Sequence, residues 1–166
     1  MIPVSPDSSA NLPQSPAVPE SERPSGGAVS VGIVLVSHSR ALAEAALDLA
    51  RRLIVAVDVP VELAAGLADG GLGTDPGAVV EAVELLAERC EGVLVLADLG
   101  SGIMSAEMAL EMLDPALAER TRLSAAPFVE GLLGAYGAAG IGKDLQAVAA
   151  EADGAAEAKR SQVAAF

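Results

Sequence analysis

The only histidine of this 166-residue chain, His38, stands at a change in the sequence pattern. An apolar run, VGIVLVS (31–37), precedes it, and an amphipathic run, SRALAEAALDLARRL (39–53), includes the residues that follow it. This pattern predicts that His38 lies where a strand ends and a helix begins. A neutral imidazole, which is abundant at pH 7, is able to attack phosphorus without a helper base. His38 is therefore a candidate catalytic nucleophile, and the alternative is a histidine that only marks a helix boundary.

A nucleophilic imidazole needs a hydrogen bond at its second ring nitrogen, which fixes the tautomer and the orientation of the ring. Asp98 follows the apolar run EGVLVLA (91–97) and is the acidic residue placed best for this role. The alternative for Asp98 is a helix cap or a solvated loop acid. Ser37, His38 and Asp98 have the composition of a hydrolase triad, but adjacent serine and histidine side chains point apart. No G-x-S-x-G motif is present either, so we exclude that chemistry.

Small and hydroxyl-bearing residues near these candidates suggest where a phosphoryl group would bind. Ser39, Gly100 and Ser101 lie at predicted helix starts, where free backbone N–H groups and the helix dipole favour anions. Gly73 and Thr74, in a glycine-rich loop, would add a close backbone approach and a hydroxyl. Ordinary capping, or an ordinary loop, is the alternative for each of these residues. The loop lacks the pattern G-x-x-x-x-G-K-[ST], so nucleotide binding of that type is not predicted.

Alternating apolar and amphipathic segments predict an α/β fold with a mostly parallel sheet. Strands are expected at residues 31–37, 59–66, 91–100 and 121–127, and helices at 39–53, 75–90, 101–113, 128–140 and 143–162. Right-handed crossovers leave few topologies, and we expect the strand order 2-1-3-4 with helices on both faces. The carboxyl ends of the first and third strands then flank the switch point, where ligands bind. His38, Asp98 and the glycine-rich loop are expected to converge there.

Side-chain spacing also predicts which helix faces are buried. The first helix is expected to bury Leu42, Ala45, Ala46 and Leu49. A methionine stripe with a four-residue repeat is expected in the core: Met104, Met108 and Met112. Asp75 is expected to cap the second helix, and Pro76 is expected to be its first residue.

Composition excludes several classes of function. The net charge of −13 argues against binding to nucleic acid or to an anionic membrane surface, because both need clustered lysine and arginine. The single cysteine, Cys90, cannot form an internal disulfide, which suits a reducing compartment, and it is expected to have only a packing role at the end of a helix. One histidine and one cysteine cannot complete a zinc site, and we expect neither a metal nor another cofactor.

The first 28 residues differ in composition from the rest of the chain. They contain six of the ten prolines and no extended apolar run, so we expect a disordered leader and a folded domain over residues 29–166. The leader has neither a basic start nor an apolar core, so it does not resemble a signal peptide. No apolar run is long enough for a membrane span. The expected location is the cytoplasm.

Several segments, taken together and in order, resemble the DhaM family. They are GIVLVSHSRALAEAALDLA, GTDPGAVVEAVE, VLVLADLGSGIMSAEMALEML and RLSAAPFVEGLLGAYGAAG, and the similarity spans roughly residues 30–150. Members of this family are phosphotransfer subunits of phosphoenolpyruvate-dependent dihydroxyacetone kinase and are related to mannose-type EIIA domains. The resemblance implies a phosphotransferase that carries a phosphoryl group on a histidine.

The resemblance also implies partners and residue roles. His38 would accept the phosphoryl group from phospho-HPr and pass it to ADP held on the DhaL subunit, which then phosphorylates dihydroxyacetone bound to DhaK. Asp98 would be the acidic partner of His38, and Gly100 and Ser101 would contact the phosphoryl group. Gly73 and Thr74 match the G-T-D loop of the family. The family also implies a homodimer.

Two other functions remain open on the sequence. An EIIA component of a mannose- or sorbose-type sugar phosphotransferase system would use the same histidine but transfer the group to an EIIB domain. A non-catalytic α/β regulatory module would use His38 only to end a strand. Some DhaM relatives carry HPr-like and enzyme I-like domains after this one, whereas this sequence stops at Phe166. We therefore expect separate proteins to supply the phosphoryl group.

Overall fold

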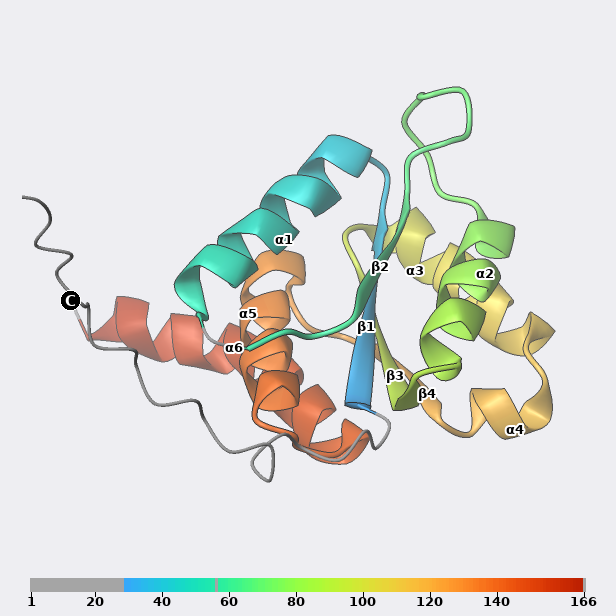
Figure 1. Cartoon of the computed structure of the whole chain (residues 1–166). Helices are drawn as coiled ribbons and strands as arrows, with labels where there is room; N and C mark the ends of the chain where they lie inside the picture. The colour runs from blue at the N-terminus through green and yellow to red at the C-terminus, as the bar shows by residue number, and fades with distance from the viewer. Residues whose placement is uncertain (1–28, 56, 166) are drawn as a thin grey trace, which may run out of the picture.

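The computed structural model describes residues 29–55 and 57–165, which form a four-stranded parallel sheet with helices on both faces (Figure 1). The strand order β2-β1-β3-β4 confirms the predicted order. The strands are β1 (Val29–Ser37), β2 (Val61–Ala65), β3 (Cys90–Ala97) and β4 (Thr121–Ser124). The helices are α1 (Arg40–Leu53), α2 (Pro76–Ala87), α3 (Gly100–Met112), α4 (Pro115–Ala118), α5 (Phe128–Gly140) and α6 (Leu145–Ala164). The predicted disordered leader, residues 1–28, lies outside the described residues.

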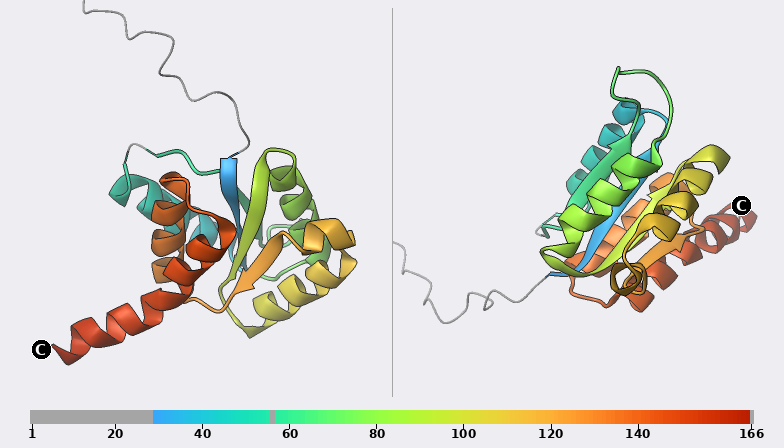
Figure 2. Two further views of the ribbon diagram at one scale, coloured as in Figure 1. Left: turned by 90° about the horizontal axis from the view of Figure 1, so that it is seen from below. Right: turned by 90° about the vertical axis from the view of Figure 1, so that its right-hand side faces the viewer.

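The central strands are apolar because both faces of the sheet are covered. In β1, Ile33 and Leu35 pack among α1, α5 and α6, whereas Val34 and Val36 pack among α2 and α3. Figure 2 shows these two helical layers on opposite sides of the sheet. A strand that is buried on both faces has no polar face, which explains the continuous apolar runs in the sequence.

The register of the sheet brings the carboxyl ends of three strands to one level. Ser37, the last residue of β1, pairs with Ala65 of β2, and its neighbour Val36 pairs with Ala97 of β3. The chain leaves all three strands at the same edge. The loop between β2 and α2 rises over this edge at the top of Figure 1. The predicted convergence of three segments is therefore confirmed.

Local sequence signals set the starts of the helices. Ser39 caps α1 and Asp75 caps α2, with Pro76 in the first turn of α2 as predicted. Asp114 and Pro115 end α3 and start the short α4, which the sequence analysis does not predict. The prediction that Cys90 ends a helix is wrong, because α2 ends at Ala87 and Cys90 is the first residue of β3, where it is buried. No helix of the described residues is long and apolar enough to cross a membrane.

The predicted buried face of α1 is confirmed for Ala46 and wrong for Leu42, Ala45 and Leu49, so it is displaced by about one residue. Leu42 and Leu49 are 44% and 40% exposed, and Ala45 is exposed too. The buried residues of α1 are Ala43, Ala46, Leu47 and Ala50. Both sets have a helical spacing, and the apolar residues of this helix cover more than one face, so spacing alone does not identify the face against the sheet.

The expectation that the methionine stripe of α3 lies in the core is also wrong. Met104, Met108 and Met112 are 66%, 54% and 59% exposed. The buried face of α3 consists of small residues, Gly102, Ala106 and Ala109. These small side chains allow the helix to lie close to the sheet, and the methionines then point away from it.

Candidate functional site

His38 lies between the last residue of β1 and the cap of α1, at the edge of the sheet where the strands end. Its side chain is 24% exposed, so the ring is neither buried in the core nor free in solvent. The loop after β2 is fixed to this segment, since the N–H of Gly73 donates to the carbonyl oxygen of His38 at 3.0 Å. The imidazole is therefore accessible at a rim whose backbone is held from two sides.

Asp98 holds His38 through both of its carboxylate oxygens. Oδ1 lies 2.9 Å from Nδ1 of the His38 ring and accepts the N–H of Leu99 at 2.7 Å. Oδ2 accepts the backbone N–H of His38 at 2.9 Å and the hydroxyl of Ser37 at 2.9 Å. The carboxylate is thus bound to the ring and to the backbone that carries the ring, so the orientation of the imidazole is fixed.

These hydrogen bonds also determine the charge of Asp98. Its side chain is only 5% exposed, and burial by itself would raise the pKa of the carboxyl. The hydrogen bonds from the backbone and ring of His38, from Ser37 and from Leu99 favour the ionised form and together outweigh burial. The pKa of Asp98 is therefore held below its usual value, and the group is a carboxylate at neutral pH.

An ionised Asp98 fixes the tautomer of His38. A carboxylate only accepts hydrogen bonds, so Nδ1 must carry the proton in the contact with Oδ1. In the neutral ring, Nε2 then has a free lone pair. The hydroxyl of Ser101 lies 2.5 Å from Nε2 and donates to it. The nitrogen that faces α3 is therefore the one without a proton.

Ser101 is connected to the glycine-rich loop. The hydroxyl of Thr74 lies 2.8 Å from the hydroxyl of Ser105, one turn further along α3, and 3.5 Å from the carbonyl oxygen of Ser101. Gly73 has a φ of +155°, and a Cβ there would lie 2.9 Å from the Leu67 side chain. Glycine is thus required at position 73, which brings Thr74 to the start of α3.

The first turn of α3 presents free backbone N–H groups next to Nε2. The N-cap residue of α3 is Leu99, so Ser101 is not the cap, and no side chain makes a capping bond at this end. The N–H groups of Gly100 and Ser101 belong to the first turn, where the helix itself supplies no acceptor. A Cβ on Gly100 would meet nothing within 4 Å, so the space beside it is open. This turn is suited to bind the oxygens of an anion.

The predicted site residues differ in how closely they approach the ring. His38, Asp98 and Ser101 are in direct contact, whereas Gly73 and Thr74 reach the site through backbone and hydroxyl contacts. The hydroxyl of Ser39 accepts the N–H of Leu42 at 3.3 Å, which is a cap interaction. No hydrogen bond between Ser39 and the ring occurs among the described residues.

The sequence analysis missed three residues that shape the site. Ser37 is fully buried and donates to Asp98, although it was considered only as a hydrolase nucleophile. Ser105 binds the hydroxyl of Thr74. A Cβ on Gly102 would lie 3.0 Å from Oδ1 of Asp98 and 3.8 Å from Cε1 of His38. The G-S-G sequence after Asp98 was a possible signal for Gly102, and no local signal indicated Ser37 or Ser105.

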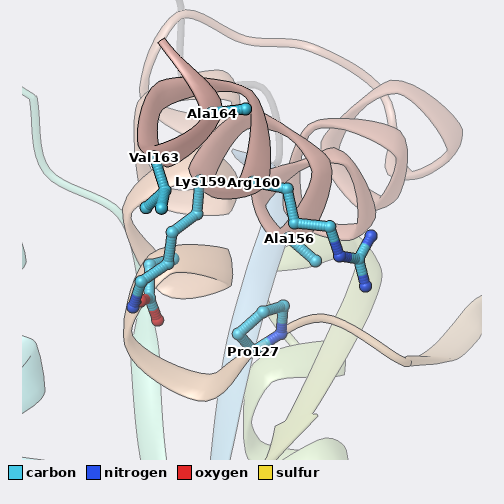
Figure 3. Close-up of a pocket in the computed structure, with 7 residues that line it drawn as sticks. Pro127, Ala156, Lys159, Arg160, Val163 and Ala164 are labelled. Atoms are coloured by element: carbon cyan, nitrogen blue, oxygen red, sulfur yellow. The ribbon is translucent and has the colours of Figure 1, made fainter. Parts of the chain in front are cut away.

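The largest of the five hollows that we found on the described surface lies on the side of the sheet that α5 and α6 cover. It has a volume of about 610 Å³ and lies between the start of α5 and the outer half of α6, as Figure 3 shows. Pro127, Ala156 and Val163 line it, together with Lys159, which pairs with Glu130. Within the described residues, no group of three histidine, cysteine or acidic side chains is placed to bind a metal ion. His38 lines none of the five hollows that we found.

Comparisons with known proteins identify the family of this chain. Residues 32–149 match the EIIA-man family, described as the PTS system fructose IIA component. The chain is 44% identical over 135 residues to proteins of Klebsiella michiganensis and Escherichia coli, each named PEP-dependent dihydroxyacetone kinase, phosphoryl donor subunit DhaM. These alignments cover 80% of this chain but only 28% of the relatives. The chain therefore spans less than a third of the length of these two relatives.

Two further matches are closer to this chain in length. A Listeria innocua protein, PEP-dependent dihydroxyacetone kinase 2, phosphoryl donor subunit DhaM, is 37% identical over 101 residues, which are 61% of this chain and 79% of that protein. A solved structure of a protein of unknown function, EF1359, has a TM-score of 0.68 and 31% sequence identity. The aligned region covers 75% of this chain and 93% of the EF1359 chain. Both matches therefore extend over most of the length of the protein that is compared with this chain.

Proposed function

Since this chain belongs to the EIIA-man family and, within it, to the DhaM proteins, we propose that it carries a phosphoryl group on His38 for a dihydroxyacetone kinase. It would act as the phosphoryl donor subunit of that phosphotransferase. The observation that supports this proposal best is the arrangement of the His38 ring. Nδ1 is bound to the Asp98 carboxylate at 2.9 Å, while Nε2 faces the first turn of α3.

In the proposed transfer, the lone pair of Nε2 attacks the phosphorus of a phosphorylated donor. The new bond between Nε2 and phosphorus forms as the bond between phosphorus and the donor breaks, and its electron pair returns to the donor atom. The imidazole gains positive charge in this step, and its proton stays on Nδ1 against the carboxylate of Asp98. Asp98 thus offsets the charge that develops on the ring, in an arrangement that already exists before the reaction.

The phosphoryl oxygens need donors of their own. Phosphoryl transfer depends mainly on in-line positioning and on stabilisation of charge on these oxygens. We propose that the backbone N–H groups of Gly100 and Ser101 bind them, and that the Ser101 hydroxyl turns from Nε2 to an oxygen once Nε2 is bonded. Thr74 and the backbone of Gly73 would complete the rim. Ser39 stays a predicted phosphoryl contact in addition to its role as the cap of α1.

The partners are those that the resemblance to the DhaM family implies, and they belong to the same proposal. Phospho-HPr would supply the phosphoryl group, ADP bound to DhaL would accept it, and DhaK would hold the dihydroxyacetone that is finally phosphorylated. A homodimer and a cytoplasmic location also stay predictions. The position of His38 supports transfer between proteins, because its side chain is 24% exposed at the edge of the sheet, where a second protein is able to reach it.

Intact-mass measurement tests the first half of the cycle. Incubation with phosphoenolpyruvate, enzyme I and HPr is expected to add one acid-labile phosphoryl group, and no addition is expected in His38→Ala. Glu91→Ala is a matched control, because it removes an exposed side chain on β3 before the site. A stable, unphosphorylated wild-type chain would support the regulatory-module alternative instead.

A second measurement tests the acceptor. The purified phosphorylated chain is mixed either with DhaL and ADP or with an EIIB domain of a mannose-type transporter. ATP formation with DhaL, without transfer to EIIB, is expected. Transfer only to EIIB would replace the proposed function with that of a sugar-transport component.

A further inference from the structure

The outer face of α3 carries a line of exposed apolar side chains that begins at the reactive nitrogen. We define the methionine stripe as Met104, Met108 and Met112, all more than half exposed. At about 100° per residue, Ser101 and these three methionines fall within a sector of roughly 80° on the helix. Ser101 is the residue whose hydroxyl contacts Nε2 of His38. The stripe therefore continues from the site, and the distance along the helix from Ser101 to Met112 is about 17 Å.

The fold does not need these methionines at the surface. The inner face of α3 packs through Gly102, Ala106 and Ala109, and the methionines lie on the other side of the helix. Isolated exposed apolar residues are ordinary, but a continuous apolar line next to a reactive group marks a contact surface. Methionine is unbranched and polarizable, so it adapts well to the surface of a second protein.

The charges around the stripe indicate what kind of surface fits it. Glu107 and Glu111 of α3 are exposed, and no lysine or arginine occurs between Arg89 and Arg120. A partner that covers the methionines must therefore bring its own cations to the acidic margin. Complementary charge at such a margin steers association and suppresses wrong partners. The matching surface is apolar at its centre and rich in lysine and arginine at its rim.

We infer that the methionine stripe is the docking surface for the protein that delivers the phosphoryl group, and this inference rests on the proposed function. In the donor step, a side chain of the donor must reach Nε2 itself, so the donor's surface has to lie directly against the start of α3. In the acceptor step, a nucleotide stands between the two proteins. The donor is therefore the partner that the position of the stripe favours.

The test compares a protein donor with a small one. Phospho-HPr is the protein donor, and phosphoramidate phosphorylates histidine chemically without any docking surface. In Met104→Glu/Met108→Glu, the KM for phospho-HPr is expected to rise by about tenfold, as for loss of an interface hot spot. The rate with phosphoramidate should stay within about twofold, because the variant leaves the ring and its bonds intact. Met104→Ala/Met108→Ala should show a smaller rise in KM, since it removes apolar area without adding charge.

Val163→Glu is the matched control. Val163 is also helical and is 68% exposed, but it lies on α6, beside the hollow of Figure 3. Its KM for phospho-HPr should equal that of the wild type. Glu107→Lys/Glu111→Lys should raise the KM as well, and this rise should shrink as salt is added.

Three outcomes would overturn the inference while the proposed function stands. The first is an unchanged KM in both methionine variants. The second is an equal loss of rate with phosphoramidate, which would show that the substitutions act on the ring. The third is a change in sedimentation of the methionine variants, which would assign the stripe to contact with a second copy of this chain. A wild-type chain that neither donor phosphorylates would instead refute the proposed function, and the inference with it.

Discussion

The two sides of α3 are built by different means. On the inner side, small residues pack against the sheet and polar groups make a closed set of hydrogen bonds, in which Asp98 binds His38, Ser37 and Leu99. On the outer side, exposed methionines follow Ser101 and are not fixed by packing. The inner side fixes one imidazole in one tautomer and one orientation. The outer side offers an adaptable surface, as recognition of a partner requires.

This difference separates two properties that one helix supports. Reactivity depends on geometry within a few tenths of an ångström and is therefore controlled by short hydrogen bonds from buried groups. Recognition tolerates adjustment and is controlled by exposed apolar area and charge. Substitutions on the inner side should slow transfer from any phosphoryl donor, whereas those on the outer side should affect only transfer from a protein. The following predictions test the inner side, where both donors should report the same loss.

Asp98→Asn is expected to have the largest effect. An amide at position 98 is able to donate its N–H to Nδ1, which moves the ring proton to Nε2 and removes the nucleophilic lone pair. The rate of His38 phosphorylation should fall by between about 100-fold and 10,000-fold, with phospho-HPr and with phosphoramidate alike. Rapid-quench measurement of the phosphorylated fraction checks this. A loss confined to phospho-HPr would mean that Asp98 contacts the donor and does not orient the ring.

Ser37→Ala should give the next largest effect. The variant removes a donor to Asp98 Oδ2 and also the acceptor that Ser37 Oγ offers to the N–H of Ser39 at 3.1 Å. Because Ser37 is fully buried, the free energy of unfolding should fall by about 1–3 kcal/mol. The phosphorylation rate should fall by about tenfold with both donors. Ser30→Ala removes a hydroxyl from the opposite end of β1 and should leave the rate unchanged.

The hydrogen bonds of Asp98 should also make the free energy of unfolding depend on pH in the acid range. The pKa of Asp98 is lower in the folded state than in the unfolded chain, so the folded protein gains stability from this group above the unfolded pKa of about 3.9. This stability is lost as the pH falls through the lower, folded value. Urea unfolding at a series of pH values should therefore show a steeper acid loss for the wild type than for Asp98→Asn. Parallel curves would contradict the low pKa of Asp98.

The sequence predicted the sheet better than the helix surfaces. The central parts of β1 and β3, residues 31–36 and 93–97, are apolar, as expected for strands that are covered on both faces. Right-handed crossovers then leave few topologies, and the observed order is the one that was expected. The faces of α1 and α3 were assigned wrongly because both helices have apolar residues on more than one side. Which side lies against the sheet depends on packing distance, and in α3 the small residues Gly102, Ala106 and Ala109 decide it.

The sequence predicted which residues form the centre of the site, but not all of the hydrogen bonds that hold them. His38 and Asp98 each follow an apolar strand in the sequence, so their meeting at one edge follows from the topology. The contact of Ser37 with Asp98 depends on where a strand-end side chain points, and the contact of Thr74 with Ser105 depends on the path of a glycine-rich loop. Neither property is encoded by local spacing, so both required the structure.

Gly102→Ala is the smallest and most specific test of the inner side, because stability and rate should respond differently. The new Cβ would lie 3.0 Å from Oδ1 of Asp98, so the carboxylate must move by a few tenths of an ångström. Alanine favours a helix over glycine by about 1 kcal/mol, which offsets this strain in the free energy of unfolding. We expect nearly unchanged stability with phosphorylation slower by about two- to fivefold, since ring orientation is impaired. Gly154→Ala, where nothing lies within 4 Å of the added Cβ, should raise stability and leave the rate unchanged. Equal rates in the two variants would show that transfer tolerates a displaced Asp98 carboxylate. Reactivity would then depend less on the exact geometry of the inner side of α3 than we propose.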